Sequence, residues 1–430
     1  MKKIALILAL ILLPFSFASA EEKVTITFWH CMADAAGDLI NAYVDDFNAT
    51  VGAEAGIHVE AVFQGAYNEA VTKMNSMIFG GNLKDLPDVM QMDATGKVSY
   101  SECEKRYTLD QALADHPDAG LSSFLPAPLN NWALQGVQLG APFASSTTVT
   151  YYNKTVLDSY GIAAPDTLDD IAAMAAVIPA QEGVSIYTCV PNTPLLANWL
   201  GQMGSALVNG SNGTEETATA LSCLENGALE AFLGRWQALY QSGALNNANS
   251  SSDAFAAGSQ LIMTSSSSSV ASVLKKVNGA FEVGICDYPR VSADALHGAT
   301  ASGSCLVMFD QGDLRREAAY QFVRYMTGGD VQADLASRTG YAPSCLEAEE
   351  TQTWQDFVKD NPLFGVALSQ LKRTPAGMRS VTVGPSADFY YAIIADISDM
   401  LTGGASPADT AALMAEDLNG MLEQYALSNP

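Results

Sequence analysis

The chain has 430 residues, and its 47 acidic side chains outnumber the 21 basic ones, which gives a formal net charge of −26 at neutral pH. A surface this acidic repels the phosphates of nucleic acids and of anionic lipids, so the composition excludes nucleic acid as a partner. The apolar content of 48% is too high for an acidic disordered chain, and we expect a folded protein of two or more domains.

The first 20 residues have the pattern of a secretory signal peptide. Lys2 and Lys3 precede an apolar run over 4–13, and small residues end the segment at Ala20. The apolar run is too short to span a bilayer, and no cysteine stands at the cleavage site to carry a lipid anchor. The sequence therefore predicts an exported protein of the periplasm or cell surface that is soluble after cleavage near Ala20.

The segment that follows alternates strand and helix patterns. Strands are predicted at 24–28, 57–63 and 88–92, and helices at 34–48 and 66–79. This order is typical of a parallel sheet with helices on its faces. Because ligands bind outside the carboxyl ends of the strands in such sheets, we expect 30–32, 64–67 and 93–96 to lie at a ligand-facing edge.

The stretch 140–154 passes from Gly and Pro through small hydroxyl residues into a β-branched and aromatic run. Gly and Pro punctuate structure, and the apolar run after them is typical of a buried strand. We interpret the stretch as a hinge crossover between two lobes, with Ser145 and Ser146 facing the cleft. A surface Ser/Thr loop that leads into an ordinary strand is the alternative.

A second α/β body is predicted after the crossover. Thr167 is a plausible helix cap, 229–241 has the pattern of an amphipathic helix, and 209–214 is expected to form a hairpin or a surface loop. The five-serine run 265–269 lies between a strand-like and a helix-like segment. It would present hydroxyls and backbone N–H groups to an anionic or hydroxylated ligand, although a flexible linker is the alternative.

The remainder of the chain is predicted to return to the first body and then to end in helices. The return runs over 299–308 through a Gly/Ser turn at 302–304, and the two helices are expected at 390–401 and 408–425. No internal repeat is visible.

Cysteine and histidine spacing gives no sign of a metal site. The seven cysteines form no CxxC motif and the four histidines no metal-spaced pair, so we expect no metal and no cofactor. The cysteines are interpreted as buried small hydrophobes, although an exported chain is able to form disulfides. No nucleophile elbow, P-loop or dinucleotide motif appears, and we expect no enzyme. A secreted hydrolase that acts on glycosides or phosphodiesters through paired carboxylates is the alternative.

Four segments in order resemble motifs of the family 1 extracellular solute-binding proteins, the substrate receptors of ABC importers. They lie at 25–30, at 140–154, at 255–263, and at 318–326 together with 339–343. Each motif is weak alone, and their common order makes the resemblance specific. It implies an α/β type II periplasmic-binding-protein fold of two lobes, each a mainly parallel sheet flanked by helices, with the ligand in the cleft.

The resemblance also implies a division of the chain and a set of partners. After the signal peptide at 1–20, lobe 1 would comprise 21–143 and 291–343, and lobe 2 would comprise 144–290 and 344–430. A monomeric receptor would capture a small molecule by hinge closure and deliver it to ABC permease subunits in the membrane.

Within the family, the sequence most resembles the receptors for glycerol 3-phosphate and its diesters. Together with neighbouring positions in the same motifs, this resemblance implies ligand contacts at Tyr67, Asp93, Ser145, Ser146, Ser267, Ser268, Ser302, Gly303, Tyr341 and Arg379. The planar fork of an arginine matches phosphate oxygens, and a tyrosine supplies a hydroxyl on a rigid ring. An exposed surface arginine and tyrosines that only pack in the core are the alternatives.

Two positions depart from the pattern of the glycerol-3-phosphate receptors. Their ligand-binding glutamate falls on Ala94, and their aromatic platform falls near Thr193, with Trp199 further along. These departures leave the phosphate end of the site better supported than the glycerol end. We therefore expect a bulkier polyol phosphate, a phosphodiester or an acidic sugar as the ligand, in place of glycerol 3-phosphate itself.

Overall fold

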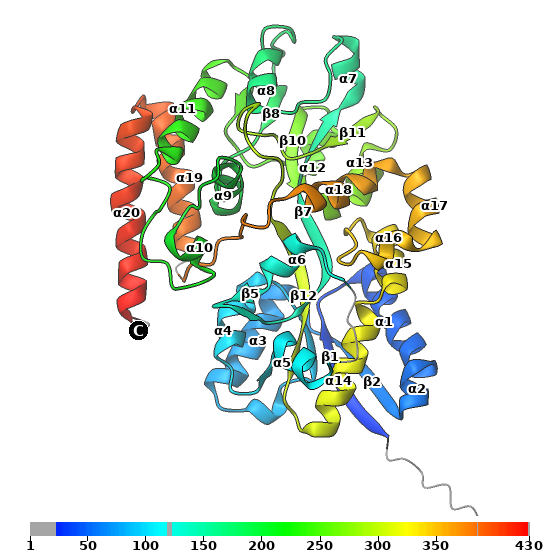
Figure 1. Ribbon diagram of the computed structural model, residues 1–430. Helices are drawn as coiled ribbons and strands as arrows, with labels where there is room; N and C mark the ends of the chain where they lie inside the picture. Colours follow the sequence, from blue (N-terminus) through cyan, green and yellow to red (C-terminus); the bar gives the residue numbers. More distant parts are fainter. Residues whose placement is uncertain (1–22, 118–122, 385, 429–430) are drawn as a thin grey trace, which may run out of the picture.

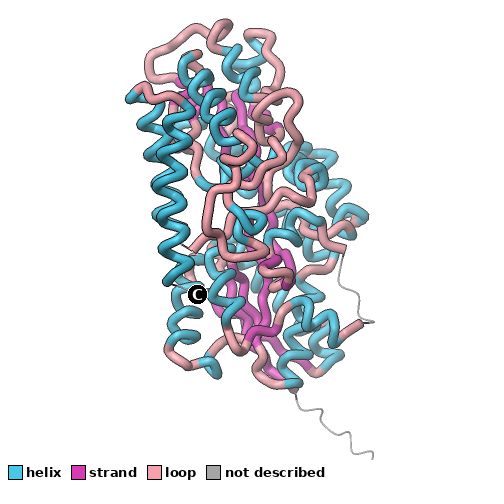
Figure 2. Tube along the Cα trace, turned by 60° about the vertical axis from the view of Figure 1, so that its left-hand side comes forward, coloured by secondary structure: helices cyan, strands magenta, loops and turns pink. Residues whose placement is uncertain are grey.

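The computed structural model describes residues 23–117, 123–384 and 386–428, and it consists of two bodies joined by long strands (Figure 1). The signal-peptide prediction for 1–20 falls outside the described residues. Figure 2 shows strands running through the middle of the molecule, with helices on the outside.

The first body has the predicted parallel strands. β1 (Val24–His30) pairs in parallel with β2 (Ile57–Phe63) and with β3 (Val89–Met92). Inward side chains of β1 such as Phe28 are fully buried, which explains why alternation located this strand, whereas every residue of β3, including Val89, is buried. The helices between the strands, α1 (Asp34–Ala49) and α3 (Tyr67–Phe79), also agree with the predicted ranges.

One mixed sheet of ten strands runs through both bodies, with the main order β2-β1-β3-β12-β7-β10-β8-β9. β7 (Ala141–Asn153) pairs at its beginning with β12 (Ala301–Phe309) and at its end with β10 (Gln260–Ser266) and β11 (Val283–Cys286). All but two residues of β7 are buried, because the strand is covered along its whole length. The crossover is therefore a continuous strand, and the alternative of a surface loop is wrong.

The second body is built on short parallel strands and long helices. β8 (Ser185–Thr188) pairs in parallel with β10 and with β9 (Leu245–Asn246). α9 (Thr193–Gln202), α11 (Ala228–Gln241), α19 (Ser386–Gly403) and α20 (Pro407–Ser428) cover it, and the last two run side by side in both views (Figures 1 and 2). Thr167 caps α8 (Leu168–Met174) as predicted, since its Oγ1 accepts from the Asp170 amide at 3.0 Å.

The remaining elements are short helices and strands. They are α2 (Val51–Ala55), η1 (Leu83–Asp85), η2 (Ala94–Gly96), α4 (Lys97–Glu102), β4 (Arg106–Tyr107), α5 (Leu109–Asp115), α6 (Pro126–Asn131), β5 (Ala133–Leu134), β6 (Val137–Gln138), α7 (Lys154–Ser159), α10 (Asn209–Gly213), α12 (Ser252–Ala256), η3 (Ser267–Ser269), α13 (Val270–Val277), α14 (Asp313–Met326), α15 (Gly329–Thr339), α16 (Glu347–Glu350), α17 (Gln352–Asp360), η4 (Pro362–Phe364) and α18 (Gly365–Arg373).

Segment 209–214 is a tight coil with positive φ at four consecutive residues, 210–213, and it is not a hairpin. Asn212 Oδ1 accepts from the amides of Leu207 and Val208, so the buried side chain stabilises the tight coil.

Six cysteines in the described part of the chain are free thiols that are buried or half-buried, in agreement with their interpretation as small hydrophobes. They are Cys31, Cys103, Cys189, Cys223, Cys286 and Cys305.

Replacing Asp396 with asparagine is expected to stabilise the protein at pH 7.5. Asp396 is buried on α19, and burial, followed by the charges of Asp417 and Asp399, raises its pKa from 3.8 to about 6. Because the folded pKa exceeds the unfolded one, ionisation above pH 6 destabilises the folded state. We expect a gain of about 1–2 kcal/mol at pH 7.5 in urea unfolding, which disappears near pH 4.

Glu423→Gln is the matched control, since Glu423 is exposed on the neighbouring α20 and loses the same charge. It should change the free energy of unfolding by less than about 0.5 kcal/mol. A gain for Asp396→Asn that persisted unchanged at pH 4 would contradict the titration argument.

Candidate functional site

A cavity of about 720 Å³ lies between the two bodies. The first body contributes the start of η2 and α4, the end of α6, and the beginning of β12 to its wall. The second body contributes α9, the chain after α18, and helices α19 and α20. Hydroxyl groups and aromatic rings dominate the lining, which includes Asp93, Ala94, Lys97, Asn131, Thr193, Ser302, Gly303, Ser380, Tyr390, Tyr391 and Tyr425. We call this space the interlobe cavity.

Asp93 lies at the carboxyl end of β3, where the sequence placed it, and lines the interlobe cavity. Its carboxylate accepts from the amide of Thr95 at 3.2 Å and from the Thr95 hydroxyl, so it caps the short helix η2. A capping aspartate retains free lone pairs, and one oxygen remains able to accept from a ligand hydroxyl.

Lys97 is a cavity-lining residue that the sequence analysis missed. Its side chain is only 1% exposed, and its Nζ donates one long hydrogen bond, 3.4 Å, to the carbonyl of Asn131. Burial lowers the pKa of Lys97 to about 8, with a raising effect of Cys305 and a lowering effect of Arg379. The sequence did contain a signal for Lys97, because it directly follows the predicted ligand-facing segment 93–96. Its burial, however, depends on elements that are distant in the sequence.

Ser302 and Gly303 line the interlobe cavity, and Ser146 lies directly behind Ser302. The two serine hydroxyls are 2.9 Å apart. Gly303 has φ of 101°, a conformation that favours glycine, and it begins a bulge in the pairing of β12 with β7. The structure therefore brings these three predicted residues together at the crossover.

Ser145 lies in the same strand but faces a different environment. Its hydroxyl is 2.7 Å from that of Ser344, which also donates to the carbonyl of Phe143. Ser145 is 2% exposed and is not among the residues that line the interlobe cavity. Neighbouring residues of a strand point to opposite faces, which explains why the two serines separate.

Tyr67 and Tyr341 form a second group, joined by a hydrogen bond between their hydroxyls. Gln91 Nε2 donates to the Tyr67 hydroxyl at 3.1 Å and to Ser304 Oγ at 2.9 Å. Burial raises the pKa of both tyrosines, so both hydroxyls stay protonated. This network holds the carboxyl ends of β1 and β3 together, since Gln91 Oε1 also accepts from the Cys31 amide.

Ser267 and Ser268 both lie in the short helix η3, directly after β10, so the alternative of a flexible serine linker is wrong. Ser267 Oγ accepts from the Thr147 amide at 3.2 Å, and the hydroxyls of Ser268 and Ser266 are 2.9 Å apart. An added side chain on Gly340 would meet the carbonyls of both residues, which places them beside Tyr341.

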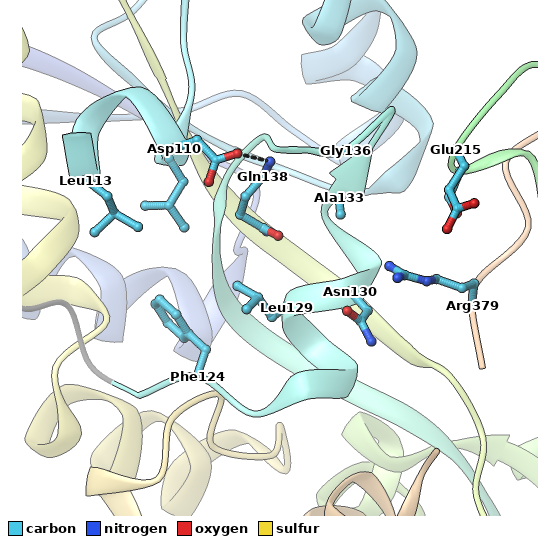
Figure 3. Close-up of a pocket in the computed structure, with 12 residues that line it drawn as sticks. Asp110, Leu113, Phe124, Leu129, Asn130, Ala133, Gly136, Gln138, Glu215 and Arg379 are labelled. Carbon is cyan, nitrogen blue, oxygen red and sulfur yellow. Dashed lines mark hydrogen bonds between the residues drawn. The ribbon is translucent and has the colours of Figure 1, made fainter. Parts of the chain in front are cut away.

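Arg379 lines a neighbouring cavity of about 590 Å³, which we call the arginine cavity. In Figure 3 its guanidinium points from the C-terminal segment toward Asn130 and Ala133 of the first body, with Glu215 on the other side. The carbonyl of Arg379 accepts from Asn212 Nδ2 at 2.8 Å, so the tight coil 209–214 fixes its position. Ser380, the next residue, lines the interlobe cavity.

The two bodies touch beside the arginine cavity. Asn130 Nδ2 donates to the carbonyl of Ala376 at 2.9 Å, and the Gln135 amide donates to the carbonyl of Thr214 at 2.6 Å. These hydrogen bonds join the first body to segments of the second body, across the space that the cavities occupy.

Both positions that depart from the glycerol-3-phosphate receptors, Ala94 and Thr193, line the interlobe cavity. Trp199 does not replace the missing aromatic platform, because its indole donates to the carbonyl of Pro289 at 3.1 Å inside the core. Tyrosines of α19 and α20 line the cavity instead, and the rings of Tyr390 and Tyr391 meet edge to face at 5.3 Å. In the sequence, the available sign of this aromatic cavity wall was the pair of adjacent tyrosines at the start of the helix predicted at 390–401.

Residues 42–364 match the family model described as bacterial extracellular solute-binding protein. The matched range covers most of the chain and includes the crossover strands. The chain belongs to this family. The two lobes and the cleft of this solute-binding protein are the family's type II arrangement, which confirms the fold class inferred from the ordered motifs.

Curated relatives of this solute-binding protein include the sn-glycerol-3-phosphate-binding periplasmic protein UgpB of Yersinia pestis, 25% identical over 87% of this chain and 85% of the relative. UgpB from Mycobacterium tuberculosis, solved in complex with glycerophosphocholine, superposes with a TM-score of 0.71 at 20% identity over 94% of this chain and 99% of the other. The cyclic α-maltosyl-1,6-maltose binding protein of Arthrobacter globiformis gives 0.76 at 19% identity, over 93% and 99%.

These relatives and structures are binding proteins and give no support to the alternative of a secreted hydrolase. Within the described ranges of this solute-binding protein, no helix has the length and apolar character that a membrane span requires.

Proposed function

We propose that the protein is the extracytoplasmic receptor of an ABC importer and captures a small anionic solute, namely a polyol phosphate, a phosphodiester or an acidic sugar. The observation that carries this proposal is the interlobe cavity, which combines hydroxyl groups, tyrosine rings and the cation Lys97, with the guanidinium of Arg379 beside it. Rings and hydroxyls suit a polyol, and cations suit its acidic group.

Hinge closure is proposed to bury the ligand between two lobes, 21–143 with 291–343 and 144–290 with 344–430. The crossover strands β7 and β12 are proposed as the hinge. Both belong to the chain segments that connect the two lobes, and they are hydrogen-bonded to each other as neighbouring strands. The receptor is proposed to act as an exported monomer, to dock on permease subunits in its closed form and to catalyse no reaction.

The ligand contacts are proposed to form two tiers. Asp93, Ser302 and Gly303 contact the ligand in the interlobe cavity, and Arg379 reaches its anionic group from the arginine cavity. Behind them stands a supporting tier: Tyr67, Ser145, Ser146, Ser267, Ser268 and Tyr341. When the hinge closes, the hydrogen bond between Tyr67 and Tyr341 is proposed to break. The hydroxyls of the supporting tier then become available to the ligand.

The test of the function is the small molecule that the purified protein retains, identified by mass spectrometry after denaturation. We expect an anionic polyol or glycoside, a smaller radius of gyration in scattering when it is added back, and weaker binding of plain glycerol 3-phosphate than of larger phosphodiesters or acidic sugars. Radii that stay equal at saturation, or turnover of the bound compound, would contradict the proposal.

Replacing Arg379 with alanine is expected to weaken binding of the retained anionic solute by about 1.5–3 kcal/mol, the usual contribution of a hydrogen bond to a charged group. The guanidinium makes no ion pair within the described part of the chain, so its charge is available to a ligand. Isothermal titration calorimetry at constant ionic strength measures the loss. Arg235→Ala is the control, since its exposed ion pair with Asp169 joins α11 to α8 and Arg235 lines neither cavity, so the affinity should not change. Equal affinities for all three proteins would refute the role of Arg379.

A further inference from the structure

Lys97 combines near-complete burial with a place in the wall of a large cavity. It begins α4, directly after the turn that Asp93 caps, and its side chain is 1% exposed. An ammonium group has three donors, and the single long bond to the Asn131 carbonyl leaves two of them without a protein acceptor in the described chain.

No carboxylate balances the charge of Lys97, which forms no ion pair among the described residues. The groups that face it are Cys305 of β12, whose thiol burial keeps neutral by raising its pKa, and Arg379, a second cation. Asp93 lines the same cavity and is hydrogen-bonded to Thr95 through one oxygen, but its carboxylate forms no ion pair with Lys97. The tyrosines of α19 and α20 complete the wall.

We propose that Lys97 is the charge-selecting residue of the cleft and that its ammonium binds the oxyanion of the ligand in the interlobe cavity. This inference rests on the proposed function, since it assigns the acidic group of that solute to a position in the wall. Arg379 approaches the same anion from the arginine cavity, and the two cations together exclude neutral sugars that lack an acidic group.

The physical reason is the cost of a buried charge. A desolvated ammonium without a counter-charge is unfavourable, and a bound oxyanion supplies both the charge and the missing acceptors. Burial holds the pKa of Lys97 at about 8 in the unliganded protein. An anion favours the protonated form, so binding takes up a proton above pH 8 and the affinity falls as the pH rises.

The experiment uses inorganic sulfate, a phosphate-like oxyanion that does not titrate in this range, with chloride at the same ionic strength as reference. Saturable binding to the unliganded protein is measured by calorimetry and by the shift in unfolding temperature. The variants are Lys97→Met, which removes charge and hydrogen bond, and Lys97→Gln, which keeps a donor for Asn131. Lys84→Met, an exposed lysine in η1, is the matched control.

We expect sulfate to bind the wild type and Lys84→Met equally, and to bind both Lys97 variants at least about tenfold more weakly. The wild-type affinity should fall between pH 7 and 9.5, and that of Lys97→Gln should stay level. If Lys97 had only a structural role, its substitution would lower the unfolding temperature but would change neither the affinity for sulfate nor the pH dependence of that affinity. Unchanged sulfate affinity in Lys97→Gln, or a wild type that sulfate does not bind, would overturn the assignment.

The two proposals fail in different ways. Sulfate binding that needs Lys97, in a protein that retains no organic solute and shows no closure, would overturn the proposed function and leave the anion site standing. A retained anionic solute that binds Lys97→Gln as tightly as the wild type would overturn the role of Lys97 and leave the receptor function standing.

Discussion

Replacing Gly303 with alanine should destabilise the protein by about 2–5 kcal/mol, the sum of a left-handed backbone penalty and of overpacking. Gly303 has φ of 101°, and a Cβ atom there would lie 1.9 Å from the carbonyl oxygen of Ala144. That oxygen belongs to the backbone of β7, so it has no flexible side chain that is able to move away. Urea unfolding at pH 7 measures the loss.

The same substitution should disturb the hinge, because Gly303 lies where β12 and β7 change register. Gly377→Ala is the matched control: Gly377 is exposed, and no atom lies within 4 Å of the added Cβ. It should change stability by less than about 0.5 kcal/mol. Equal unfolding midpoints for the two variants would show that the bulge does not need a glycine.

Replacing Gln370 with leucine should cost about 3 kcal/mol of stability, because it leaves several buried partners without hydrogen bonds. Gln370 is fully buried on α18, and its Nε2 donates to Thr147 Oγ1 at 2.9 Å and to the Thr148 carbonyl at 2.7 Å. Its Oε1 accepts from the Tyr288 amide at 2.6 Å. One side chain thus ties the middle of the crossover strand to α18 and to the loop after β11.

Gln370 lines neither the interlobe nor the arginine cavity, so any loss of ligand affinity in Gln370→Leu would act through the crossover. The control is Gln352→Leu, which removes only an exposed bond to Asp356 along α17 and should be neutral within about 0.5 kcal/mol. A loss below about 1 kcal/mol for Gln370→Leu would mean that the crossover does not depend on this anchor.

The sequence determined the local structure and the family of this protein. β2 occupies the predicted 57–63, because alternation with a period of two reports directly which side of a strand is buried. Thr167 caps its helix as predicted, since the bond to Asp170 spans only three residues. The four motifs in order between residues 25 and 343 predicted the family, which the match over 42–364 confirms.

Only the tertiary structure decided which side chains meet in the cleft. The burial of Lys97 depends on α6 and β12, and Arg379, the cation that lowers its pKa, follows it by more than 280 residues. Trp199 lies in the core, and Tyr390 and Tyr391 of a C-terminal helix line the cavity instead. Periodicity shows that a residue faces inward, but it carries no information about which distant segment packs against it, because such contacts form only when the chain closes long loops.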